Sequence, residues 1–218
     1  MSSTKSMAML FNCTISRSAL KLVLLTLVVV LVTACTSTPP RHQDDICKIF
    51  REKSGWYDDA ADARENWGSP IPVMMAIMHQ ESRFQQKAKP PRGKLLGFIP
   101  WLRPSDAYGY SQAKDATWDW YIKGSGNYGA DRDDFGDAID FIGWYNYTSK
   151  NSCQIKPTDP YHLYLAYHEG HGGFNRRTFK NKAWLKTVAK KVSARSSRYT
   201  VQLSRCEESL KSPWWQFW

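Results

Sequence analysis

Residues 69–84 read SPIPVMMAIMHQESRF and establish the helical character of the chain. The apolar side chains recur at the three- and four-residue spacing of a helix face: Val73, Met74, Ile77 and Met78. Ser69 and Pro70 suit an N-cap and a first helical turn. The segment therefore predicts an apolar helix that ends near Phe84 and carries an acid, Glu81, in its last turn.

Helical signals continue from Asp45 to the end of the domain. Asp133 and Asp134 suit the cap of another helix, and Asp159 followed by Pro160 marks the start of a third. We expect that third helix to end at a group of glycines: Gly170, Gly172 and Gly173.

A last helix is expected over about residues 177–210. Its apolar stripe contains Leu185, Val188, Val192, Tyr199, Leu203 and Cys206. Its basic residues lie mainly off that stripe: Lys186, Lys190, Lys191, Arg195, Arg198 and Arg205. Because no alternating strand pattern of useful length and no repeat occur, residues 46–210 are predicted to form one all-α domain.

Two stretches depart from the helical pattern. Residues 87–104 contain four Pro, which exclude a regular helix and predict a loop or a small hairpin. Residues 211–218 form a Trp-rich tail. Both stretches either pack on the domain's own surface or contact a membrane interface or a protein partner.

The first 34 residues resemble an export signal. A basic stretch precedes the run LVLLTLVVVLV at residues 22–32, which is too short to span a membrane. Residues 32–35, Val-Thr-Ala-Cys, resemble a bacterial lipobox, which implies that Cys35 is lipidated and that 35–45 form a tether. Thr36 then favours a lipoprotein of the outer membrane that faces the periplasm. The alternative is an ordinary signal, or a short anchor, with an incidental Cys.

Export makes disulfides available to the three cysteines that follow Cys35. Pairing Cys47 with Cys206 would join the first helix to the last and remove roughly 4–5 kcal/mol of chain entropy from the unfolded state. We prefer that pair, with Cys153 as the competing partner.

The composition describes a folded, basic domain. The 218 residues carry a net charge of +10, and 14% of them are aromatic. These values exclude collagen, a coiled coil and a polytopic membrane protein. The charge favours an anionic glycan or lipid as partner, while the export signal argues against nucleic acid.

Four sparse motifs follow one another along the chain. They are Glu81-Ser82, Gly109-Tyr110-Ser111-Gln112, a glycine-bearing helix at 138–145, and Ala166-Tyr167-His168 with glycines after it. In this order and spacing they resemble the lysozyme-like, SLT-type lytic transglycosylases over roughly residues 69–174. The usual family sequences at the second and fourth motifs are Gly-Leu-Met-Gln and Ala-Tyr-Asn. The chain therefore departs from the family at Tyr110, Ser111 and His168, and the Pro-rich insertion lengthens the first gap.

The resemblance implies a lysozyme-like fold and a reaction on peptidoglycan. The MurNAc-GlcNAc β-1,4 bond would be cleaved without water, leaving a 1,6-anhydro-MurNAc end, and neither cofactor nor metal would take part. Glu81 would act as acid and then as base. Its helix is apolar, and poor solvation raises a carboxyl pKa and keeps the acid protonated. The implied substrate-binding residues are Ser82, Tyr110, Ser111, Gln112, Tyr167 and His168. Among them, Gln112 would hold an N-acetyl group, and Tyr167 would bond Glu81 or the sugar.

Several other hypotheses remain open. If Asp106 faced Glu81, it could activate water, as in goose-type lysozymes, and the enzyme would be a hydrolase. The cluster at residues 168–171, His-Glu-Gly-His, is a weak candidate for a metal hydrolase, because zinc-protease histidines stand four apart. The acidic residues 131–134 fit helix capping better than a calcium loop. A non-catalytic peptidoglycan-binding scaffold, with a protein partner in an envelope machine, is the last alternative.

Overall fold

A computed structural model describes residues 37–91, 94–95, 99–100 and 105–211. The export signal, Cys35 and residues 212–218 of the Trp-rich tail lie outside the described residues. Within the described part of the chain, no helix is both long enough and apolar enough to cross a bilayer.

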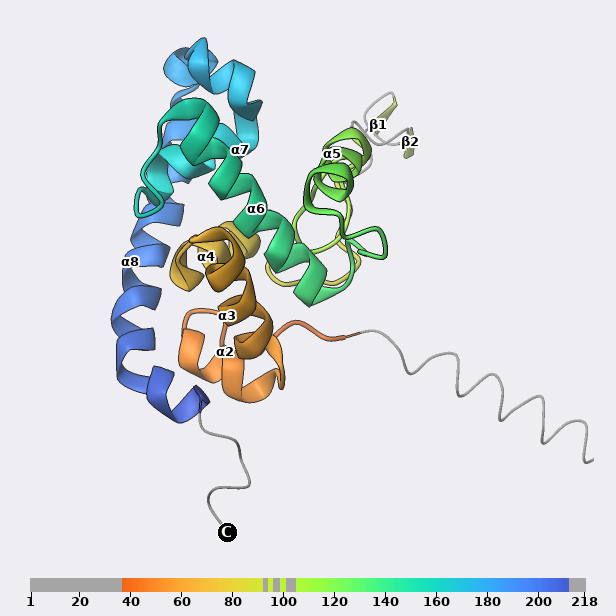
Figure 1. The fold of residues 1–218 in the computed structure, drawn as a ribbon. Coiled ribbons are helices and arrows are strands. Elements are labelled where there is room, and N and C mark those ends of the chain that lie inside the picture. Colours follow the sequence, from red (N-terminus) through yellow and green to blue (C-terminus); the bar gives the residue numbers. More distant parts are fainter. Residues whose placement is uncertain (1–36, 92–93, 96–98, 101–104, 212–218) are drawn as a thin grey trace, which may run out of the picture. The chain divides into compact units, whose positions relative to one another are not determined.

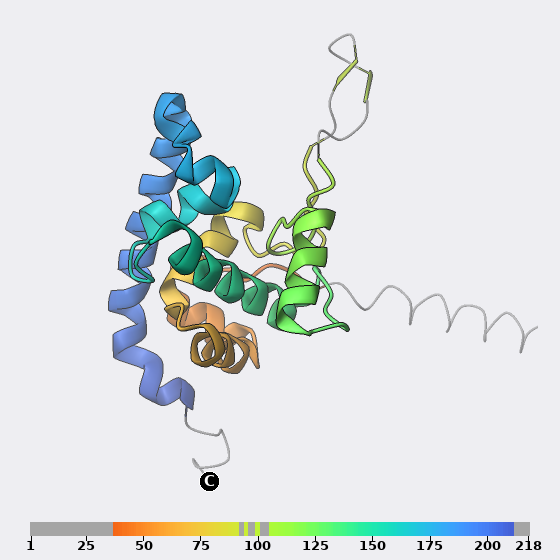
Figure 2. The same cartoon turned by 45° about the horizontal axis from the view of Figure 1, so that its top comes forward.

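The domain is all-α, as predicted (Figures 1 and 2). Its helices are α2 (Ile46–Glu52), α3 (Trp56–Trp67), α4 (Ile71–Ser82), α5 (Asp115–Ser125), α6 (Phe135–Cys153), α7 (Pro160–Asn175) and α8 (Ala183–Lys211), with a 3-10 turn, η1 (Thr178–Asn181), before α8. Within the Pro-rich insertion, β1 (Lys94–Leu95) and β2 (Ile99–Pro100) pair antiparallel, so that Leu95 lies opposite Ile99. The insertion thus contains the small hairpin that the sequence allowed.

Aspartates begin three of the helices. The side chains of Asp45, Asp134 and Asp159 each accept a hydrogen bond from a backbone N–H in the first turn of α2, α6 and α7. Capping therefore accounts for Asp134 of the acidic cluster. At α4 the expected cap is wrong, because Pro70 holds that position and Ser69 Oγ instead accepts from Asn146 Nδ2 at 2.9 Å.

Helix α6 is the element around which the others pack. It contacts α3, α4, α5 and α7 (Figure 1). A Cβ at Gly143 would lie 2.9 Å from Trp67 and 3.2 Å from Met74, so glycine is needed where α3 and α4 approach α6. Asp140 accepts hydrogen bonds from Trp67 Nε1 at 2.6 Å and from Tyr121 Oη at 2.7 Å. These contacts join α3 and α5 to α6.

The predicted end of α7 and start of the last helix both need correction. Gly170 takes φ 72° and ψ 158°, so it kinks α7, but the helix resumes and ends at Asn175. Arg177 has φ 59°, which stops a continuous helix from residue 177. The chain forms η1 first, and α8 begins at Ala183.

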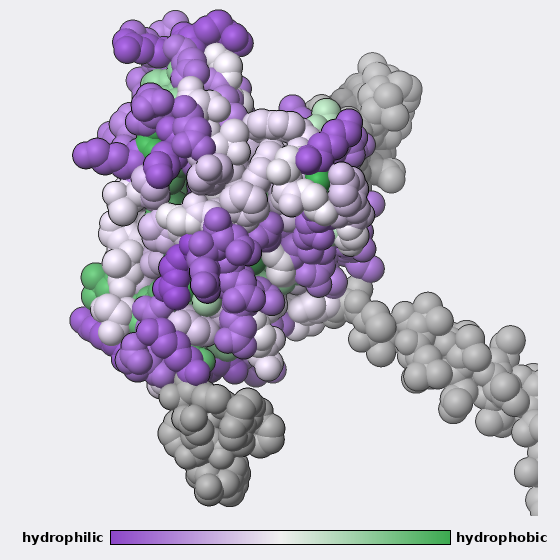
Figure 3. All heavy atoms as spheres, viewed as in Figure 1, coloured by the Kyte–Doolittle hydropathy of each residue, from purple (hydrophilic) through white to green (hydrophobic). Residues whose placement is uncertain are grey.

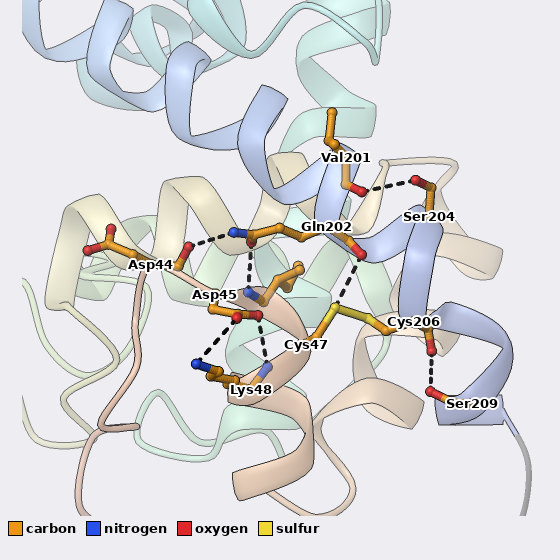
Figure 4. Close-up of a disulfide and its surroundings, with 10 residues drawn as sticks. Asp44, Asp45, Cys47, Lys48, Val201, Gln202, Ser204, Cys206 and Ser209 are labelled. Carbon is orange, nitrogen blue, oxygen red and sulfur yellow. Dashed lines mark hydrogen bonds and ion pairs between the residues drawn. A yellow bond between two sulfur atoms is a disulfide. The ribbon is translucent and has the colours of Figure 1, made fainter.

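The first and last helices of the domain are covalently joined. Cys47 of α2 and Cys206 of α8 form a disulfide (Figure 4). Cys153 is a free thiol. One turn away, Gln202 accepts from Ile46 N and donates to Asp44 O, each at 3.0 Å. The Gln202 side chain of α8 thus forms hydrogen bonds with the backbone at the start of α2.

Replacing both bonded cysteines by Ser should lower the free energy of unfolding by about 2–5 kcal/mol, because the disulfide closes a loop with a sequence separation of 159 residues. Urea unfolding under non-reducing conditions measures the change. Cys153→Ser is the matched control and should change stability by less than about 1 kcal/mol. An equal loss in the control would show that the effect does not come from the crosslink.

Candidate active site

The C-terminal end of α4 places Glu81 one residue before the helix stops. Arg83 and Phe84 follow with φ values of 52° and 59°, so the chain turns sharply out of the helix. The Phe84 ring is fully buried and lies 5.9 Å from the Trp56 ring. Because Phe84 is anchored in the core, the turn fixes the end of α4 and with it the position of Glu81.

The Glu81 carboxyl group lies among poorly polar neighbours. Burial raises its pKa to about 7, and a hydrogen bond from the Tyr164 hydroxyl opposes that rise. Burial also raises the pKa of Tyr164, so this hydroxyl keeps its proton and donates it to the carboxylate. No cation among the described residues forms an ion pair with Glu81. The group is therefore an acid that is still partly protonated near neutral pH.

Glu81 lines a cleft with a volume of about 470 Å³. Three of the predicted substrate-binding residues also line this cleft: Gln112, Tyr167 and His168. Phe141 and Tyr145 of α6 form an aromatic wall, with the Tyr145 ring 5.1 Å from that of Tyr167. An acid, an amide and several aromatic rings suit a polar ligand with flat apolar faces, such as a sugar.

The loop before α5 brings Gln112 to the cleft. It turns at Gly109, where φ is 76° and a Cβ would lie 1.9 Å from Arg132 O. Gln112 Nε2 donates to Ala88 O and to Gly109 O, each at 2.9 Å. The amide is therefore held in place by its nitrogen, and its oxygen is the atom that it can offer to a donor on a ligand.

The Tyr167 hydroxyl has a protein partner other than Glu81, which was one of the two partners predicted for it beside a bound sugar. The Tyr167 hydroxyl donates to Ser111 O at 2.7 Å, which ties α7 to the Gly109–Gln112 loop. The hydrogen bond to Glu81 comes instead from Tyr164, three residues earlier on α7. The sequence analysis missed Tyr164, although the helical spacing of the two tyrosines already indicated that they share a face.

Three predicted substrate contacts lie in the core instead. Ser82 is 4% exposed, and its hydroxyl donates to Met78 O within α4. Tyr110 is 2% exposed, with its ring edge-on to that of Trp56. Ser111 is fully buried. None of them lines the cleft. Ser82 faces its own helix, and the loop turns Tyr110 and Ser111 inward while it presents Gln112 to the ligand space.

A second carboxylate, Glu169, lines the cleft but is already fully engaged. Burial alone would raise its pKa, yet hydrogen bonds from Lys182, Thr178 and His168 hold it at about 2. Lys182 Nζ lies 2.8 and 3.0 Å from the two carboxylate oxygens. Glu169 is thus a permanent anion that positions its neighbours and is poorly suited to accept a proton.

Asp106 lies outside the cleft. Its side chain is exposed, and it lines a separate hollow with Lys89, Asp115 and Arg132. The hypothesis of a water-activating partner for Glu81 requires a carboxylate that faces it across the cleft, and Asp106 does not occupy that position.

The two histidines of the 168–171 cluster diverge. His168 Nδ1 lies 3.1 Å from Glu169, whereas His171 Nε2 lies 2.8 Å from Ser149 Oγ and its ring stacks on Tyr145. Because α7 is kinked at Gly170, between the two histidines, their imidazole rings have different neighbours. In the part of the chain that the structure describes, no three His, Cys, Asp or Glu side chains gather as metal ligands do.

Comparison with known proteins supplies the class to which this site belongs. The family model described as "Transglycosylase SLT domain" matches residues 23–206. The match covers well over half of the chain, so the chain belongs to this family. A comparison with curated proteins finds no match. Family membership implies a transglycosylase that acts on peptidoglycan, and it agrees with the lysozyme-like fold expected from the four motifs.

Glu81→Gln should stabilise the protein at pH 8 and have little effect at pH 4. The carboxyl pKa is raised from 4.5 to about 7 in the folded state, so stability declines as the pH rises through that window. The amide cannot ionise, and its stabilising effect at pH 8 should be about 1–3 kcal/mol. Urea unfolding at both pH values measures it.

Glu65→Gln is the control for this experiment, because Glu65 is an exposed glutamate on α3. It should show no gain that depends on pH. A gain in Glu81→Gln of the same size at pH 4 and pH 8 would contradict a raised pKa at Glu81.

Proposed function

We propose that the protein cleaves the β-1,4 bond between MurNAc and GlcNAc in peptidoglycan and leaves a 1,6-anhydro-MurNAc end. The protonated Glu81 gives its proton to the glycosidic oxygen as the bond from that oxygen to C1 of MurNAc breaks. The substrate's own N-acetyl oxygen stabilises the positive charge at C1. The 6-hydroxyl oxygen then bonds to C1 and returns its proton to Glu81, so no water is consumed.

The observation that carries this proposal is the solitary acid in the cleft. Glycosidases that use water or a covalent intermediate normally need a second carboxylate beside the scissile bond. Among the described cleft residues, the other carboxylate is Glu169, which is bound by Lys182 and holds a pKa of about 2. A reaction in which one carboxyl group serves as acid and later as base needs no such partner.

The neighbours of Glu81 suit the two halves of this reaction. The Tyr164 hydroxyl fixes the direction of the carboxyl group while burial keeps the proton in place near neutral pH. The free oxygen of the Gln112 amide can accept from the N–H of an N-acetyl group, which would orient that group toward C1. Tyr167 holds the loop that carries Gln112 against α7.

An exposed aromatic ring extends the cleft beyond His168. Trp184, at the start of α8, is 56% exposed, and its ring centroid lies 5.1 Å from that of His168. The face of the molecule seen in Figure 3 is mostly hydrophilic. Trp184 exposes its indole ring to solvent next to His168, which lines the cleft. We propose that Trp184 stacks against a sugar ring of the bound glycan strand.

The proposed setting is the bacterial envelope. An export signal at 1–34, lipidation at Cys35 and a tether at 35–45 would hold the catalytic domain at the outer membrane, facing the periplasm, where peptidoglycan lies. The Trp-rich tail at 211–218 would be available to a membrane interface or to a protein partner in an envelope machine. Peptidoglycan glycan strands are the substrate partner.

Mass spectrometry of the products tests the proposed reaction. Purified protein should release 1,6-anhydro-muropeptides from peptidoglycan, and Glu81→Gln should reduce the rate at least about 1,000-fold, because the amide cannot donate the proton. Asp106→Asn is the matched control and should keep full activity. Products one water heavier, together with loss of activity in Asp106→Asn, would identify a hydrolase instead.

Trp184→Ala should weaken binding of glycan strands about three- to tenfold, since one stacked ring contributes about 0.5–1.5 kcal/mol. Binding to insoluble peptidoglycan in the Glu81→Gln background measures the effect without cleavage. Tyr128→Ala serves as the control, because Tyr128 is 81% exposed and does not line the cleft. Equal binding by the Trp184 variant and its parent would refute the stacking role.

A further inference from the structure

A second hollow lies between α4 and α8, on a different face of α4 from Glu81. It has a volume of about 400 Å³. Its polar lining comes from two helices: His79, Gln80 and Arg83 on α4, and Lys191, Arg195 and Arg198 on α8. No acidic side chain is among the described residues that line it.

The arrangement follows from the spacing of these residues. Positions 79, 80 and 83 share one face of α4, and positions 191, 195 and 198 share one face of α8. The two helices pack against each other (Figures 1 and 2). Three of the basic residues predicted to lie off the apolar stripe of α8 therefore face α4: Lys191, Arg195 and Arg198.

The positive charge of the hollow is only partly balanced. Asp44 contacts Arg195 at 2.6 Å and Arg198 at 3.7 Å. Arg83 and Lys191 have no ion-pair partner among the described residues. One carboxylate is thus shared by two of the four permanent cations, and a net positive charge faces a space large enough for a small anion.

Two further features concern the residues that line the hollow. Burial and then the nearby Arg195, Arg83 and Arg198 lower the pKa of His79 to about 4, although Asp44 opposes them. Arg83 itself adopts φ 52° at the C-cap of α4, where glycine is usual and a side chain is disfavoured. This conformation ends α4 and leaves the Arg83 side chain at the edge of the hollow.

We propose that this hollow binds a phosphate group, either as a free phosphate or as the headgroup of an anionic phospholipid. Arginine forks match the tetrahedral oxygens of phosphate and donate two hydrogen bonds each, while Lys191 adds a point charge. The Gln80 amide can donate a further bond. This site is separate from the cleft and does not depend on the reaction at Glu81.

Titration of the full-length protein with inorganic phosphate at constant ionic strength tests the site, using calorimetry. A parallel arm measures binding to vesicles of phosphatidylglycerol against phosphatidylcholine vesicles. The double variant Arg83→Gln/Lys191→Gln should weaken binding at least about tenfold, because two charge-assisted hydrogen-bond donors are lost. Binding in the phosphate arm alone identifies a soluble ligand, and binding to phosphatidylglycerol alone identifies a lipid.

The matched control is Lys190→Gln/Arg205→Gln, which removes the same two charges from exposed positions of α8 outside the hollow. It carries the same N-terminal segment as the test variant, so the comparison reports the hollow alone. Equal weakening by the two double variants, or no binding of wild-type protein in either arm, would overturn the proposal.

His79 gives a second readout at the site itself. A bound anion stabilises the imidazolium form, so saturating ligand should raise the pKa of His79, as followed by NMR of the ring. A ligand that binds without moving the titration of His79 binds elsewhere, and that result would also overturn the proposal.

Discussion

The chemistry of the candidate site depends on the enclosure of one carboxyl group at the end of an apolar helix. Helix α4 is buried along most of its length by α3, α6 and α8, and its last turn delivers Glu81 into the cleft. Burial of the carboxyl group is not offset by an ion pair with any cation among the described residues, and its pKa rises to about 7. The Tyr164 hydroxyl then gives the acid a direction while leaving it able to protonate and deprotonate.

The kink at Gly170 divides α7 into two functional parts. The segment before it supplies Tyr164 to the acid and Tyr167 to the Gln112 loop. The residues around the kink hold a different network, in which Glu169 binds Lys182. A straight helix would continue the tyrosine face past this point. Because Gly170 kinks the helix, α7 can place Tyr164 beside Glu81 and also place Glu169 at the edge of the cleft.

Capping and periodicity are local signals, and they predicted the helical class and most helix starts. The resemblance of the four motifs to a known family predicted a cleft that Glu81, Gln112 and Tyr167 line together. It could not place Tyr110 or Ser111, since the direction of a loop depends on turns such as the one at Gly109. Tyr164 was missed because a tyrosine on an apolar helix face is expected in the core. Its place beside Glu81 comes from the packing of α7 against α6 and α8, which no local sequence pattern shows.

The disulfide has a topological consequence. Cys47 and Cys206 lie near the two ends of the helical domain, so the intervening chain forms one covalent ring that contains Glu81, the whole cleft and the hairpin insertion. A protease that cuts a single peptide bond within this ring, for example in the insertion, leaves both pieces linked. In an oxidising compartment, the nicked molecule would keep its parts together until a thiol reductant opened the crosslink.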